Sequence, residues 1–132
     1  ERDFQQVMET MRGEKVDVAF FPVDPRLGMM FDAGPNYFAM VVKPRLMIPM
    51  HFWERAEVIR EYARRSRSPQ TEIIAMTTPG DMILLEFDEQ ENMTVHMQSV
   101  TSAPVARNKK VQLEAYDGEN PFNDSDLPVD ME

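Results

Sequence analysis

Two short and almost uninterrupted apolar runs constrain the fold of this 132-residue chain more than any other feature. The first run covers residues 16–23 and the second covers residues 45–50. Runs of this length without polar alternation are typical of strands that are covered on both faces, as in parallel sheets. Pro22 removes a backbone donor near the end of the first run, which indicates that the strand ends there.

Helical patterns precede, separate and follow these two runs. Apolar side chains within residues 4–11 share one helical face, and Gly13 is placed to end that helix. We expect a second helix over residues 34–42 and a third over about residues 54–65. Alternation of helices and strands predicts an α/β fold in which parallel strands are joined by right-handed crossovers.

The second half of the chain has a different pattern. Three short strands separated by polar turns are predicted within residues 71–98, which indicates a C-terminal β meander. Residues 112–132 contain seven acidic side chains and no lysine or arginine, a composition that favours an acidic tail, docked or partly mobile. We therefore expect a folded domain over residues 1–98 and an acidic extension over residues 99–132.

Composition excludes several classes of function. The net charge of −9 argues against a sequence-independent nucleic-acid binder, which needs basic side chains to neutralise phosphates. The absence of cysteine excludes disulfides and thiolate metal sites and is compatible with a cytoplasmic protein. No apolar stretch is long enough to span a membrane. The local basic cluster Arg60, Arg64, Arg65 and Arg67 is interpreted as the solvated face of a helix, with phosphate or partner binding as the alternative.

Polar side chains follow both apolar strands at the point where each strand ends. Asp24 and Arg26 come after the first strand, and His51 comes after the second. If the strands are parallel neighbours, these residues share the sheet edge at which ligands collect in such folds. The alternatives are structural: Asp24 organises a turn, Arg26 pairs with a carboxylate, and His51 is an ordinary hydrogen-bonded histidine. His96, on the polar side of an alternating strand, is expected to be exposed to solvent.

The residues alone do not define a complete catalytic site. A catalytic zinc needs about three protein ligands, and a two-metal site needs more. The chain has two histidines, no His-x-His pair, no nucleophile elbow and no glycine-rich phosphate loop. By itself, the chain does not have the composition of a complete metal enzyme.

Two segments carry a resemblance to a known family. They are residues 17–28 (Asp-Val-Ala-Phe-Phe-Pro-Val-Asp-Pro-Arg-Leu-Gly) and residues 43–53 (Lys-Pro-Arg-Leu-Met-Ile-Pro-Met-His-Phe-Trp). Together they resemble the C-terminal half of metallo-β-lactamase-fold hydrolases, and most closely the bacterial branch that includes the ascorbate-6-phosphate lactonase-like proteins. The resemblance extends over about residues 3–87.

The resemblance implies a specific fold and a specific role for His51. It implies half of a four-layer αββα sandwich, with a mixed sheet flanked by helices and with metals bound at one sheet edge. His51 matches the family's last metal ligand, and Asp24 and Arg26 match a loop that borders the metal cleft. The other ligands of the family, including its His-x-His-x-Asp-His signature, are expected upstream of Glu1.

Two hypotheses follow from the resemblance. In the first, the chain is part of a metal-dependent hydrolase that uses zinc or manganese and acts on a small-molecule substrate, with the missing N-terminal half as its partner. In the second, the chain is a non-catalytic half-domain that binds a partner or a second copy of itself through an apolar sheet face, and it holds no metal alone. Neither hypothesis involves nucleic acid or a membrane.

Overall fold

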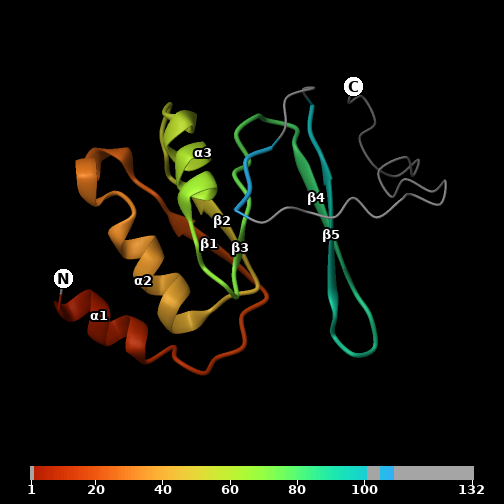
Figure 1. Cartoon of the computed structure of the whole chain (residues 1–132), viewed down its shortest axis with the longest axis horizontal. Coiled ribbons are helices and arrows are strands. Elements are labelled where there is room, and N and C mark those ends of the chain that lie inside the picture. The colour runs from red at the N-terminus through yellow and green to blue at the C-terminus, as the bar shows by residue number, and fades with distance from the viewer. Residues whose placement is uncertain (1, 101–104, 109–132) are drawn as a thin grey trace. The chain divides into compact units, whose positions relative to one another are not determined.

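The computed structural model describes residues 2–100 and 105–108, which form two compact units (Figure 1). Of these residues, the first unit contains 2–77 and 105–108, and the second contains 78–100. The fold is mixed α/β, as the alternating helix and strand patterns predict. No helix within the described residues is long and apolar enough to cross a membrane.

The sheet of the first unit is entirely parallel. It contains β1 (Val18–Pro22), β2 (Leu46–Met50) and β3 (Glu72–Ile73), in the order β1-β2-β3. The parallel pairing of the two apolar runs confirms the prediction made from the alternation of elements. The expectation that the first run is covered on both faces is wrong, because β1 is an edge strand and Phe20 is 60% exposed.

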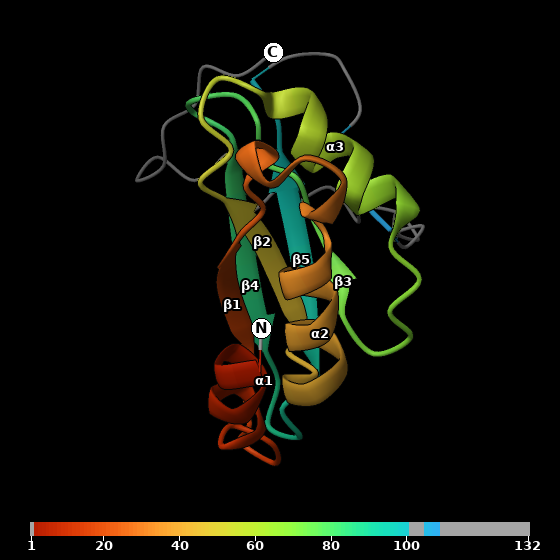
Figure 2. The same ribbon diagram turned by 90° about the vertical axis from the view of Figure 1, so that its left-hand side faces the viewer.

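Three helices cover one face of this sheet. They are α1 (Arg2–Glu9), α2 (Ala33–Val42) and α3 (Ala56–Arg65), and they lie on the same side of the three strands in both ribbon views (Figures 1 and 2). α2 ends at Lys43, which adopts a left-handed conformation with φ 55°. Pro44 follows directly and cannot continue a helix.

The core of the first unit lies between the helices and the sheet. Strand alternation directs three register partners, Ala19, Met47 and Ile73, to the helical side, where all three are buried. Phe21 belongs to the same face and stacks on Phe38 of α2 with ring centroids 4.6 Å apart. The intervening strand residues carry apolar side chains to the opposite face, and these are Val18, Phe20, Leu46, Ile48 and Met50.

β3 is shorter than predicted and belongs to a different sheet. Only Glu72 and Ile73 of the predicted strand 71–77 pair with β2, and they pair in parallel. The next residue, Ile74, forms an isolated antiparallel bridge with Arg107. The predicted three-stranded meander is therefore replaced by a parallel strand and a separate hairpin.

Residues 105–108 return to the first unit and complete its β3 edge. The side chain of Asn108 accepts a hydrogen bond from Ile73 N at 2.6 Å and donates one to Thr71 O at 2.8 Å. Arg107 forms an ion pair with Glu72, and both side chains are largely buried. The two Asn108 bonds satisfy backbone groups that a strand of two residues leaves unpaired.

The second unit is an antiparallel hairpin of β4 (Met82–Phe87) and β5 (Met93–Gln98). Asp88 organises its turn by accepting hydrogen bonds from the backbone N–H groups of Gln90 and Asn92. His96 is 22% exposed and lies 2.9 Å from a carboxylate oxygen of Glu86. His96, which was expected to be exposed to solvent, is therefore only partly exposed.

Most of the predicted acidic extension lies outside the described residues, namely residues 101–104 and 109–132. The boundary between residues 1–98 and 99–132 stays a prediction, as does the four-layer sandwich. The described part establishes a three-stranded parallel sheet covered by helices and a two-stranded antiparallel sheet.

Candidate functional site

The two apolar strands end side by side at one edge of the parallel sheet. Pro22 and Met50 are register partners at the ends of β1 and β2, and Val23 N donates to Met50 O at 3.0 Å. The chain segments that follow, beginning with Asp24 and His51, therefore leave the sheet at the same edge. This is the arrangement predicted from the sequence.

Asp24 and Arg26 form a tightly bonded pair just beyond β1. Asp24 caps the 3₁₀ segment Pro25–Met30 by accepting a hydrogen bond from Arg26 N at 2.9 Å. The guanidinium of Arg26 donates to both carboxylate oxygens, with distances of 2.7 to 3.1 Å. Charge-assisted, forked bonds of this kind fix the orientation of an arginine side chain. Asp24 therefore organises a turn and Arg26 pairs with its carboxylate, as the structural alternative predicts, and both lie at the predicted edge of the sheet.

This pairing lowers the pKa of Asp24 to about 2. The largest cause is the side-chain hydrogen bond from Arg26, followed by the bond from Arg26 N, with a smaller electrostatic contribution from His51. Asp24 is 13% exposed and Arg26 is 64% exposed. The carboxylate is therefore ionised at physiological pH, while the guanidinium that it holds lies at the surface.

The backbone after β2 is unusual because two residues without a glycine's freedom adopt left-handed conformations. His51 has φ 63° and Trp53 has φ 57°. Phe52, between them, packs against the core of the first unit, whereas His51 and Trp53 are exposed. An L-residue in this region carries a steric cost of roughly 1–2 kcal/mol. The anchored Phe52 therefore holds its two neighbours outward in conformations that they do not favour.

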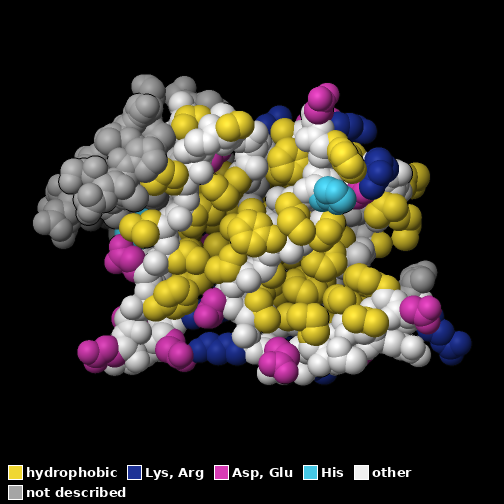
Figure 3. Space-filling model, turned by 180° about the vertical axis from the view of Figure 1, so that it is seen from behind, with side chains coloured by type: hydrophobic (Ala, Val, Ile, Leu, Met, Phe, Trp, Pro, Cys, Tyr) yellow, Lys and Arg dark blue, Asp and Glu magenta, His cyan; other side chains and the backbone are white. Residues whose placement is uncertain are grey.

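Trp53 joins the histidine to the arginine. Its ring lies 5.0 Å from the His51 ring between centroids, with 32° between the planes. The guanidinium carbon of Arg26 lies 4.7 Å from the centroid of the Trp53 ring, within cation–π range. We call Asp24, Arg26, His51 and Trp53 the strand-end cluster. A space-filling view shows histidine, basic and acidic side chains close together on a surface rich in hydrophobic side chains (Figure 3).

The strand-end cluster is not a complete metal site. Within the described residues, no group of three or more histidine, cysteine, aspartate and glutamate side chains could hold a metal ion. Asp24 is the acidic residue of the cluster, and both of its oxygens accept bonds from Arg26. The cluster therefore offers one available ligand, His51, and the expectation that the chain forms no metal centre by itself stays a prediction.

The sequence did not assign a role to Trp53. A role for Trp53 could have been inferred from its position. It is an aromatic residue two positions after a histidine that follows a strand, and an arginine follows the neighbouring strand. Such a placement permits a ring to bridge the two side chains. The left-handed conformation of Trp53 has no signal in the sequence, whereas histidine adopts positive φ more often than most other residues.

Replacing Arg26 by glutamine should raise the pKa of Asp24 from about 2 toward its ordinary value of 3.8. A lowered pKa stabilises the folded state above about pH 4, and this contribution is lost as the pH falls toward 2. The wild-type chain should therefore lose more stability than R26Q between these pH values. Carboxyl NMR titration and urea unfolding measure both effects.

Arg55→Gln is the control, because it removes the exposed ion pair with Glu57 and leaves Asp24 untouched. An Asp24 pKa that does not change in R26Q would contradict the assigned pairing.

Comparisons of the chain with protein-family models, with curated proteins and with solved structures find no significant match. The strand-end cluster is therefore interpreted from its geometry and from the two segments in which it lies. These segments, residues 17–28 and 43–53, contain all four residues of the cluster.

Proposed function

We propose that this chain supplies one edge of the active site of a metal-dependent hydrolase, with His51 as a metal ligand and zinc or manganese as the metal. The observation that carries the proposal is the left-handed, outward placement of His51 at the carboxyl edge of two parallel strands. Backbone strain of this kind persists where the surrounding structure enforces it, and it is concentrated at functional sites.

The resemblance and the geometry support the same residue independently. The resemblance assigns His51 from the sequence of residues 43–53. The geometry places His51 next to Asp24, which follows the neighbouring strand. Ligands in parallel α/β sheets bind at this edge. The convergence favours a ligand role over that of an ordinary hydrogen-bonded histidine.

Asp24 and Arg26 are assigned a place at the border of the cleft. Because Asp24 is fully engaged by Arg26, its function in the proposal is to position the arginine. Arg26 is also held over the Trp53 ring, so its guanidinium has a fixed position at the surface. A fixed guanidinium is suited to orienting a polar or anionic group of a small-molecule substrate.

The remaining metal ligands must come from outside the described residues, since these contain no group of three candidate ligands. In the proposed enzyme a partner segment supplies them, and the bound metal provides the activated water of a hydrolase. The bond that is cleaved belongs to the ester, lactone, amide or phosphodiester class. The contribution of this chain is a positioned imidazole and a positioned guanidinium.

The proposal predicts weak zinc binding that depends on His51. The 132-residue chain should not retain stoichiometric zinc after gel filtration, because one imidazole is too few ligands for tight binding. Added zinc should nevertheless shift the side-chain NMR signals of His51. His51→Ala should abolish the response at this edge, whereas the other single-histidine variant, His96→Ala, should preserve it.

Two results would contradict the proposal. Stoichiometric zinc in the purified chain would show that the site is complete without further ligands. An unchanged zinc response of the neighbouring Trp53 and Phe52 amides in His51→Ala would show that His51 is not a ligand.

The exposed apolar side chains of the sheet favour a second candidate function, a binding or dimerisation half-domain. Phe20 of β1 is 60% exposed and Met50 of β2 is 41% exposed, and strand alternation places both on the face opposite to the helices. Exposed apolar clusters are typical of protein–protein contact surfaces. Leu46 and Ile48 on the same face are already buried, so in this candidate a second copy of the chain covers the exposed part of the face at Phe20 and Met50.

If the second candidate holds, the chain sediments as a concentration-dependent dimer, and the double variant F20S/M50S becomes monomeric. Met40→Ser is the matched control, because Met40 is 60% exposed but belongs to helix α2. Analytical ultracentrifugation decides the question. A monomer at all concentrations, or a dimer that F20S/M50S leaves intact, would exclude self-association through this face.

A further inference from the structure

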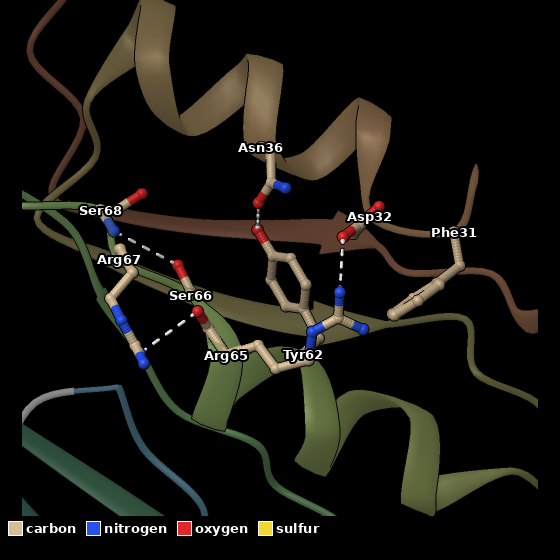
Figure 4. Close-up of a pocket in the computed structure, with 8 residues that line it drawn as sticks. All are labelled: Phe31, Asp32, Asn36, Tyr62, Arg65, Ser66, Arg67 and Ser68. Atoms are coloured by element: carbon tan, nitrogen blue, oxygen red, sulfur yellow. Dashed lines mark hydrogen bonds and ion pairs between the residues drawn. The ribbon is translucent and has the colours of Figure 1, made fainter. Parts of the chain in front are cut away.

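A pocket of about 390 Å³ lies between the start of α2 and the end of α3 in the first unit (Figure 4). This volume is within the range of small-molecule binding sites. No residue that lines the pocket belongs to the strand-end cluster. The pocket is therefore a separate candidate site, and its test is independent of the proposed hydrolase function.

One wall of the pocket is polar but uncharged. Tyr62 is 2% exposed, and its hydroxyl donates a hydrogen bond to Asn36 Oδ1 at 3.0 Å. Burial, and to a smaller extent the carboxylate of Asp32, raises the pKa of Tyr62, so the phenol stays neutral. This bond joins α2 to α3 and fixes the shape of the pocket (Figure 4).

Two opposite charges at the pocket form a loose ion pair (Figure 4). Arg65 Nη2 lies 3.9 Å from Asp32 Oδ2, beyond the usual hydrogen-bond distance. The Arg65 guanidinium also lies 5.8 Å from the centroid of the Phe31 ring. Asp32 precedes α2 but makes no side-chain capping bond to it. Both charged groups therefore keep hydrogen-bonding capacity for a ligand.

The second arginine of the pocket is already engaged. Arg67 Nη1 lies 3.3 Å from the carbonyl oxygens of Arg64 and Arg65 at the end of α3, where cations are favourable. Ser66 is buried, and its Oγ accepts a hydrogen bond from Ser68 N at 3.5 Å. The Ser66 hydroxyl proton is a further donor beside Arg65.

The arrangement of charges selects between classes of ligand. A phosphate dianion would bring two negative charges close to the Asp32 carboxylate, which is unfavourable. A carboxylate matches the fork of the Arg65 guanidinium, and an ammonium matches the Asp32 carboxylate. A molecule that carries both groups on adjacent atoms would satisfy the two charges together and replace their loose contact.

We propose that this pocket binds a small zwitterion of the α-amino acid type, with its carboxylate on Arg65 and its ammonium on Asp32. The neutral Tyr62 and Asn36 pair borders the site, and Phe31 forms its aromatic side. The basic cluster of the sequence thus contains a ligand-binding arginine, Arg65, rather than only a solvated helix face.

The test uses the full 132-residue chain and four probes. L-alanine carries both charged groups, propionate lacks the ammonium, ethylamine lacks the carboxylate, and inorganic phosphate is the competing anion. Backbone NMR spectra recorded during titration should show shifts near Asp32 and Arg65 with L-alanine. L-alanine should bind more tightly than any of the other three probes.

Variants separate the two ends of the ligand. Asp32→Asn should weaken L-alanine binding about tenfold or more, but it should leave propionate binding unchanged or stronger, because a repulsive carboxylate is removed. Arg65→Gln should weaken both, and Arg65→Lys should be intermediate because it keeps the charge and loses the fork. Arg64→Gln is the matched control, an exposed arginine on the same helix that does not line the pocket.

Three results would overturn the proposal. They are an absence of L-alanine-dependent shifts at the pocket, tighter binding of phosphate or propionate than of L-alanine, and equal L-alanine affinity in Asp32→Asn and the wild type. Thermal unfolding of each variant establishes that it is folded before its affinity is compared.

Discussion

The parallel pairing of β1 with β2 is the constraint on which the rest of the first unit depends. It aligns Ala19 with Met47 on the helical side, where both contribute to the core. It also pairs Pro22 with Met50, so both strands end at the same edge of the sheet and the residues that follow them leave the sheet there. A shift of one residue would reverse the faces of the apolar side chains and expose the core set. The same register that buries the core therefore brings Asp24 next to His51.

Beyond this edge, the side chains of the strand-end cluster are held in place although the backbone of two of its residues is in an unfavourable conformation. Phe52 is partly buried against the core, while its neighbours His51 and Trp53 adopt left-handed conformations. Asp24 fixes Arg26 through forked hydrogen bonds, and Trp53 lies against both Arg26 and His51. Each member of the strand-end cluster is thereby held by another member.

The sequence predicted the features that depend on local patterns. Periodicity located the helices and the two long strands, and the strand ends located Asp24, Arg26 and His51. It failed where contacts join distant residues. The return of Arg107 and Asn108 to β3 depends on side-chain bonds across some 35 positions of sequence, which no periodicity encodes. The exposure of Phe20 follows from its position in an edge strand, which the sequence does not show. The closeness of Asp32 and Arg65 depends on how the helices pack.

We propose that His51 adopts its strained conformation because the position of its side chain is needed, and not because the fold requires an imidazole there. The unfolding free energy of His51→Gly tests it most directly, because glycine adopts positive φ without the steric cost. We expect the unfolding free energy of His51→Gly to equal that of the wild type or to be up to about 1 kcal/mol higher. Met50→Gly, in an extended strand position, should have a lower unfolding free energy than the wild type. A loss of about 1 kcal/mol or more in His51→Gly would show instead that the imidazole stabilises the fold.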